Sequence, residues 1–182
     1  MDNILFVNAC ISESSRTLRL ARYLLNHIEG QLTQLELQNE DDLLSLDQNQ
    51  LHQRENGTYS TKYAQLLASA DIVVVAAPFY DLSFPSLLKT FVEMCCVQGV
   101  AFSYDAMGQC HSLCRAKKVF YVTTAGGSFD PRFGYEYIKA VFSMFFGVDD
   151  CTLFMAENLD LFDHDPEAIL QQTEVEMDTY FE

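Results

Sequence analysis

An unbroken apolar run in the middle of the chain is the strongest structural signal in this sequence. Residues 71–80 read Asp-Ile-Val-Val-Val-Ala-Ala-Pro-Phe-Tyr, without the alternation that marks a strand with one face in water. A strand that is apolar at every position is expected where helices cover both faces of a parallel sheet. The loop that begins at Pro78 would then lie at the carboxyl edge of the sheet, where open α/β sheets bind ligands.

Other apolar segments alternate between the spacing of strands and the spacing of helices. Such alternation predicts strand–helix–strand units, and hence a doubly wound parallel α/β sheet with right-handed crossovers. The predicted strands cover residues 4–7, 34–37, the run from Asp71, 118–123 and 151–155. The predicted helices cover residues 17–28, with Gly30 as the stop, 62–70, 86–97, 135–146 and the segment that Pro166 opens.

Residues 38–60 interrupt this pattern. The segment is polar and rich in Asn and Gln, with a few apolar residues between Leu43 and Leu51, and we expect an excursion with little regular structure. The chain shows no internal repeat, linker or change of composition that would separate two domains. Residues 1–182 are therefore expected to form a single domain.

Charge and composition exclude several classes of partner. With 182 residues, 49% of them hydrophobic, the chain can bury a sizeable core and is expected to fold. Its formal net charge of -15 argues against nucleic acid or an anionic membrane as the main partner, because both are polyanions. From Asp149 to Glu182 there are many acidic residues and no Lys or Arg; a solvated helix face or a docking surface for a basic partner would explain them.

The cysteines and the amino end bear on location and on metal binding. The first apolar run is too short for a signal peptide or a membrane span, so a cytoplasmic protein with six reduced cysteines is expected. Cys110-His111-x-x-Cys114 has ligand types that suit zinc, but no second half of such a site is apparent. We expect no metal site and interpret these residues as a loop with incidental thiols.

A serine-rich loop precedes the first predicted helix. It reads Ser12-Glu13-Ser14-Ser15-Arg16-Thr17, and neither a G-x-G-x-x-G nor a G-x-x-x-x-G-K-[ST] motif accompanies it. Hydroxyl groups and the free amides of a helix amino terminus can bind a phosphate monoester, and Arg16 can add a charge-assisted contact. Ser and Thr are also the usual N-cap residues, so helix capping explains the same pattern.

Two more loops are expected at the same edge of the sheet. Residues 78–82, Pro-Phe-Tyr-Asp-Leu, offer aromatic surface, and residues 123–128 contain Gly126-Gly127, where backbone can approach a flat ligand closely. A simple turn and buried core aromatics are the alternatives. Together with the serine loop, they predict a site for a flat aromatic ligand that carries a phosphate.

The sequence resembles the FMN-dependent NAD(P)H:quinone oxidoreductases and azoreductases with a flavodoxin-like fold. Residues 70–80, the stretch from Ser83 through Lys89 to Phe91, and Gly99-Val-Ala-Phe-Ser-Tyr104 resemble the family's P-M-Y-N loop, the helix after it and its G-V-x-F-x-Y segment. The resemblance implies a five-stranded sheet of order 2-1-3-4-5 with helices on both faces. It also implies FMN as cofactor, NADH or NADPH as hydride donor, a quinone, azo or other small aromatic acceptor, and a homodimer.

The same resemblance assigns residues to the site. Ser15, Arg16 and Thr17 fall where the family holds the FMN phosphate, and Phe102 and Tyr104 fall near the substrate, with Tyr104 serving the partner's site in a dimer. No side chain is expected to act as a catalytic acid. The flavin ring is expected against residues Pro78, Phe79, Tyr80, Asp81, Leu82, Thr124, Ala125, Gly126 and Gly127.

The sequence departs from the family pattern at three places. Ala9 and Cys10 replace a pair of serines, Asp81 replaces an Asn, and Ala125 replaces the Arg of S-R-G-G. A carboxylate at Asp81 beside the ring would disfavour an anionic reduced flavin, and we expect a lowered midpoint potential. Besides the oxidoreductase, the sequence permits a flavodoxin-type electron carrier or a flavin-free interaction protein that keeps the fold.

Overall fold

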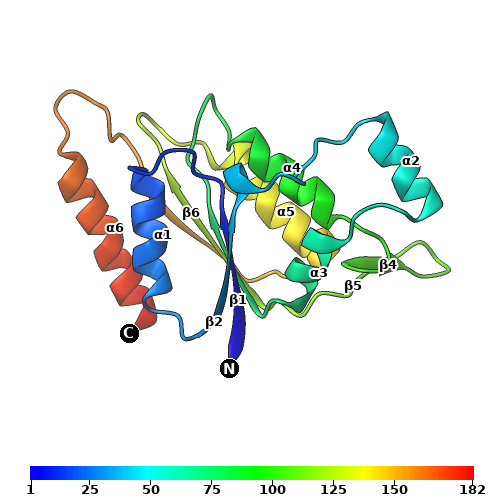
Figure 1. Ribbon diagram of the computed structural model, residues 1–182. Helices are drawn as coiled ribbons and strands as arrows, with labels where there is room; N and C mark the ends of the chain where they lie inside the picture. Colours follow the sequence, from blue (N-terminus) through cyan, green and yellow to red (C-terminus); the bar gives the residue numbers. More distant parts are fainter.

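Five parallel strands form the central sheet in the computed structural model, which describes residues 1–182 (Figure 1). Neighbouring strands pair in the order β2-β1-β3-β6-β7, and each of these pairs is parallel. The predicted doubly wound sheet and its strand order are thus confirmed. The strands are β1 (Asp2–Asn8), β2 (Gly30–Glu36), β3 (Ile72–Ala76), β6 (Lys118–Thr124) and β7 (Cys151–Ala156).

Helices cover both faces of the sheet, as the apolar run predicts. Helices α1 (Arg16–Leu25) and α6 (Pro166–Phe181) cover one face, and α3 (Lys62–Ser69), α4 (Ser86–Cys95) and α5 (Tyr135–Phe146) cover the other (Figure 1). Val73 and Val75 of β3 pack in the core with α3, α4 and α5, whereas Val74 packs in the core with α1 and α6. Burying each such side chain contributes about 1.5–3 kcal/mol, so the alternation fixes β3 as a central strand.

Gly30 is not the stop of the first helix, and this expectation was wrong. Helix α1 ends at Leu25, and Gly30 begins strand β2 beside Asp2 of strand β1. A Cβ at Gly30 would lie 2.5 Å from the Asp2 carbonyl oxygen. The glycine permits close approach of two strands, which helix periodicity cannot reveal.

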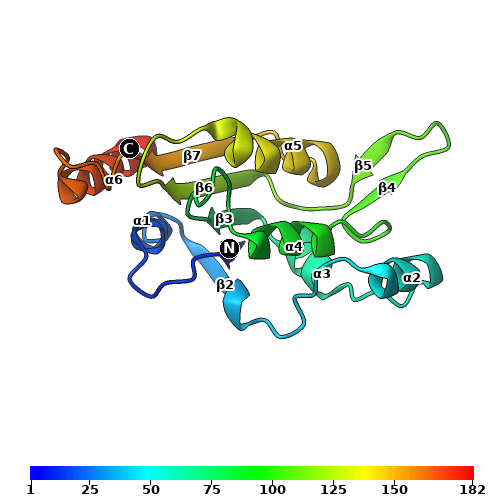
Figure 2. The same ribbon diagram turned by 90° about the horizontal axis from the view of Figure 1, so that it is seen from above.

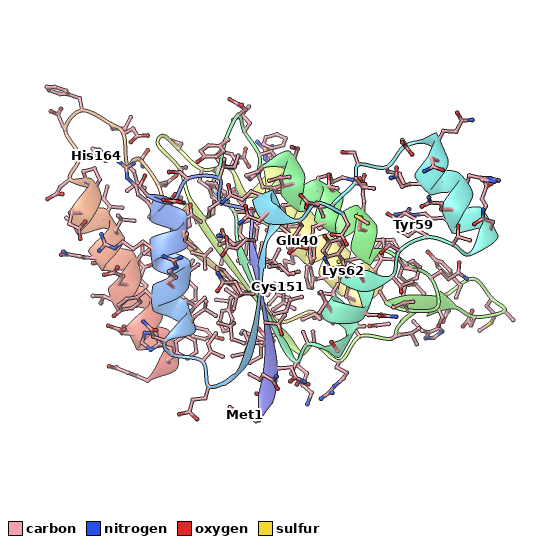
Figure 3. All side chains as sticks on the ribbon, viewed as in Figure 1. Met1, Glu40, Tyr59, Lys62, Cys151 and His164 are labelled. Atoms are coloured by element: carbon pink, nitrogen blue, oxygen red, sulfur yellow. The ribbon has the colours of Figure 1, made fainter.

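The excursion contains more regular structure than the sequence indicated. A short 3-10 helix, η1 (Leu37–Asn39), is followed by helix α2 (Gln48–Asn56). Asp47 and Gln50 form a reciprocal capping box at the start of α2, and Gly57 ends the helix in a left-handed conformation, with φ 74°. Lys62 of α3 anchors the loop between η1 and α2, because its Nζ donates to Glu40 Oε2 at 2.6 Å (Figure 3).

A two-stranded antiparallel arm projects beyond the sheet and was not predicted (Figure 2). It consists of β4 (Phe102–Tyr104) and β5 (Cys110–Ser112), so Cys110 and His111 lie in a strand and not in a loop. No group of three His, Cys, Asp or Glu side chains is arranged to hold a metal ion. None of the helices combines the length and the apolar character needed to cross a bilayer.

Candidate cofactor site

A cavity of about 680 Å³ opens at the carboxyl edge of the sheet. Its walls come from the serine loop before α1, the loops that follow β3 and β6, and the loop that follows β7. These loops meet because parallel strands end at the same edge. Of the residues that the sequence assigned to a cofactor, the cavity brings together Ser15, Arg16, Pro78, Phe79, Tyr80, Asp81, Thr124, Ala125 and Gly126.

The serine loop combines helix capping with free anion donors. Ser15 is the N-cap of α1, and its Oγ accepts from the Leu18 amide at 3.3 Å. The amides of Arg16 and Thr17, at the start of the same helix, have no hydrogen-bond acceptor. The hydroxyls of Ser12 and Ser14 also line the cavity, 3.0 Å from each other. Capping and anion binding therefore coexist, because capping uses only one of the free amides.

The loop after β3 is a tight hairpin. Tyr80 and Ser83 exchange both backbone hydrogen bonds, at 2.7 and 2.8 Å. Asp81 and Leu82 between them have φ angles of 51° and 67°, as a type I′ turn requires. This turn presents Tyr80 and Asp81 to the cavity, whereas Leu82 is 64% exposed and does not line it.

Phe79 is positioned by a neighbouring loop. Its ring meets that of Phe129 edge to face, with centroids 4.9 Å apart. Such a contact fixes the ring orientation and adds about 0.5–1.5 kcal/mol beyond area burial. Phe79 therefore offers the cavity a pre-oriented aromatic surface.

The loop after β6 is held by the loop after β7. Asn158, Leu159 and Asp160 donate their amides to the carbonyls of Gly127, Ala125 and Gly126, at 3.0, 3.2 and 2.9 Å. Gly127 lies outside the cavity wall. Thr17 is likewise outside the wall, because its side chain is buried.

Leu159 and Asp160 are cavity residues that the sequence analysis missed. Asp160 Oδ1 lies 2.7 Å from Arg16 Nη1 across the mouth of the serine loop. Their place in the sequence could have identified them. Both residues closely follow strand β7, and every strand of a parallel sheet ends at this edge. Because this part of the chain contains many Asp and Glu residues, Asp160 did not stand out as a site residue.

Phe102 and Tyr104 lie elsewhere in the same chain. They line a separate cavity of about 460 Å³ together with Tyr59 and Arg54. Tyr59 marks the α2 end of the molecule in Figure 3, away from the loops at the carboxyl edge. A single chain therefore does not bring Phe102 and Tyr104 to the cofactor cavity.

Ala9 and Cys10, which replace serines of the family pattern, are buried and do not line the cavity. Burial raises the pKa of the Cys10 thiol to about 11, so it stays neutral at physiological pH. The cavity's charged groups are therefore Arg16, Asp81 and Asp160. Chemically, the arrangement suits a flat aromatic ring against Phe79 and Tyr80 with an anionic tail at the serine loop.

The chain has clear relatives among known proteins. A family model described as a flavodoxin-like fold matches residues 2–181. An FMN-dependent NADH:quinone oxidoreductase of Clostridium beijerinckii is 33% identical over 94% of this chain and 94% of that protein. The FMN-dependent NADH:quinone oxidoreductase 2 of Clostridium acetobutylicum is 38% identical, over 62% of this chain and 58% of that protein.

A solved structure has the same fold. It is an FMN-dependent NADH-azoreductase from Bacillus anthracis str. Ames Ancestor in complex with FMN. The TM-score is 0.82, with 20% sequence identity, over 100% of this chain and 98% of that one.

Proposed function

This chain belongs to the flavodoxin-like family, and from that premise we propose that it is an FMN-dependent NAD(P)H oxidoreductase. Its acceptors would be quinones, azo compounds or similar small aromatic molecules, and the names of its relatives favour NADH as the donor. The observation that carries the proposal is the cavity at the carboxyl edge, which joins free helix amides to an aromatic hairpin.

The residues present fit FMN. Gly126 lets the loop after β7 pack closely against the cavity wall, since a Cβ there would collide with Asp160 Oδ2. The unpaired amides of Arg16 and Thr17, with the hydroxyls of Ser12 and Ser14, would hold the phosphate. Phe79 and Tyr80, on the hairpin, would lie against the ring system.

Each wall has a distinct task in this proposal. When bound, FMN supplies the redox chemistry by accepting a hydride from NAD(P)H and passing it to the acceptor. The hairpin orients the ring, because Asp81 and Leu82 are locked in the turn between Tyr80 and Ser83. The backbone at Gly126 would form the other edge of the wall, and no side chain of the cavity is needed as a general acid.

We propose in addition that the protein acts as a homodimer. Phe102 and Tyr104 line a cavity of their own on the arm side, and Tyr104 is 46% exposed. In such a dimer, the exposed aromatic on the projecting arm would lie at the cofactor cavity of the second copy. All six cysteines are free thiols, which fits a reducing compartment, and we propose a cytoplasmic location.

The spectrum of the purified protein tests the proposal. We expect oxidised-flavin absorbance that persists through gel filtration after FMN is added, and steady NADH consumption when a quinone is supplied. A Phe79→Ala variant removes aromatic surface from the cavity and should therefore bind FMN more weakly than the wild type. A colourless protein with no heat of FMN binding would refute the proposal, and bound flavin without turnover would favour a single-electron carrier.

A further inference from the structure

The charges in the cofactor cavity are unusual for a site that would hold a phosphate. Arg16 is its one cation, and Asp81 and Asp160 are carboxylates. The protein as a whole is also strongly acidic, with a formal net charge of -15. A phosphate dianion entering this cavity would meet more negative than positive charge, so the disposition of each carboxylate matters.

Asp160 forms an ion pair with Arg16. Its Oδ1 lies 2.7 Å from Arg16 Nη1, which is the distance of a charge-assisted hydrogen bond. Figure 3 labels His164, which lies on the same loop between β7 and α6. The contact therefore joins the start of α1 to this loop across the serine end of the cavity.

Hydrogen bonds hold the backbone of this loop in place. Leu159 and Asp160 donate their amides to Ala125 and Gly126 at 3.2 and 2.9 Å, so the Asp160 Cα is tied to the loop after β6. The other carboxylate oxygen, Oδ2, sits over Gly126, in the space that any Cβ at that position would take. The carboxylate is thus directed toward Arg16 by its surroundings on both sides.

The side chain itself can move. The side chains of Asp160 and Arg16 are 65% and 41% exposed, so the Asp160 carboxylate can rotate into water without unfolding the loop. An exposed ion pair is also weak, since water and salt screen it. A phosphate dianion that takes over Arg16 would therefore displace Asp160 at modest cost.

We propose that Asp160 is a carboxylate that competes with the FMN phosphate for Arg16 and so sets the selectivity of the cavity for phosphorylated flavin. The proposal rests on FMN being the cofactor and adds a residue that tunes its binding. Asp160 reduces the affinity for FMN but leaves the affinity for riboflavin, which has no phosphate, unchanged. The preference for FMN over riboflavin is consequently smaller than the serine loop alone would give.

Flavin titrations of the full-length protein test this role. Quenching of flavin fluorescence gives the Kd of FMN and of riboflavin for the wild type, Asp160→Asn, and the control Asp163→Asn. Asp163 is an exposed carboxylate of the same loop that does not line the cavity. Removing one charge close to the phosphate should lower the FMN Kd about tenfold in Asp160→Asn. The riboflavin Kd should stay constant, and Asp163→Asn should change neither value.

Several outcomes would overturn the proposal. An FMN Kd that is unchanged or higher in Asp160→Asn would mean that Asp160 positions Arg16 and does not compete with the phosphate. Equal tightening of riboflavin would mean a general effect on the cavity. Asp160→Ser is the second variant, should Asp160→Asn not fold. A wild type that binds neither flavin would refute the proposed function as well, whereas normal FMN binding without a change in Asp160→Asn refutes only this inference.

Discussion

Thr17 Oγ1 and Thr124 Oγ1 lie 2.6 Å apart, in a buried hydrogen bond between the start of α1 and the end of β6. The two residues belong to the two loops that hold opposite sides of the cofactor cavity. Thr17 is fully buried, and Thr124, which borders the cavity, is 8% exposed. Their role is to fix the distance between the serine loop and the glycine loop.

A Thr17→Val variant should therefore lose stability. The Thr124 hydroxyl would stay buried without its partner, which costs about 1–3 kcal/mol in the free energy of unfolding. The matched control is Thr123→Val, because the buried Thr123 hydroxyl has no partner in the native protein. Urea unfolding should show a loss for Thr17→Val and no loss for Thr123→Val; equal losses would contradict the role of the hydrogen bond.

Leu82 stores backbone strain in the hairpin. It has a φ of 67°, in the left-handed region where a leucine costs about 1–2 kcal/mol more than in ordinary conformations. Asn tolerates this region, so Leu82→Asn should raise the free energy of unfolding by about 1 kcal/mol. Leu161→Asn is the control, since Leu161 is also exposed and has no positive φ. A gain of the same size in the control would exclude strain as the cause.

Asp81 should influence the redox potential of a bound flavin. Its carboxylate lines the cavity and opposes negative charge on the reduced ring. We expect Asp81→Asn to raise the midpoint potential by an amount on the order of tens of millivolts. Dye-coupled reductive titration measures the value, with Asp163→Asn as the control outside the cavity. A potential that stays constant or falls in Asp81→Asn would show that the carboxylate does not act on the ring.

Asp71 should make stability depend on pH in the acid range. It accepts the backbone amide of Asn3 at 2.9 Å and pairs with Arg115, and these contacts hold the pKa of its carboxyl below the ordinary value. The stabilisation is thus complete above the unfolded-state pKa of about 3.9 and is lost as the pH falls through the lower folded-state value.

Urea unfolding at several pH values checks this dependence. The stability difference between wild type and Asp71→Asn should be largest near neutral pH and should shrink as the solution is acidified below about pH 4. Asp163→Asn is the control, because Asp163 is an exposed carboxylate in the loop before α6. A difference that grows on acidification would contradict the assignment.

The sheet and most of its helices could be predicted because their signals are local. In strand β3, successive residues are buried on opposite faces, so the unbroken apolar run itself identifies the strand as central. Helix α2 lacks such a signal, since its buried residue is Gln50 and Leu51 is 49% exposed. Its local indications were the capping box, Asp47 with Gln50, and Gly57 at its carboxyl end. Periodicity failed there because the helix packs little apolar surface.

The cofactor cavity shows the same division between local and distant information. Pro78, Phe79 and Tyr80 follow an evident strand, and their place in the wall could be predicted from that strand alone. The contact of Arg16 with Asp160 spans 144 positions and depends on which strands are neighbours. Leu82 does not line the cavity of this chain, because a type I′ turn directs consecutive side chains to different sides.

The two reciprocal backbone hydrogen bonds between Tyr80 and Ser83 have a practical consequence for enzyme engineering. Both ends of the turn are fixed by reciprocal bonds, so the tip, Asp81-Leu82, can be exchanged without altering strand β3 or helix α4. A library randomised at this dipeptide, with Gly and Asn included for the positive φ angles, would diversify the rim of the pocket on an intact scaffold. Screening it against a panel of dyes would be an economical route to new acceptor ranges.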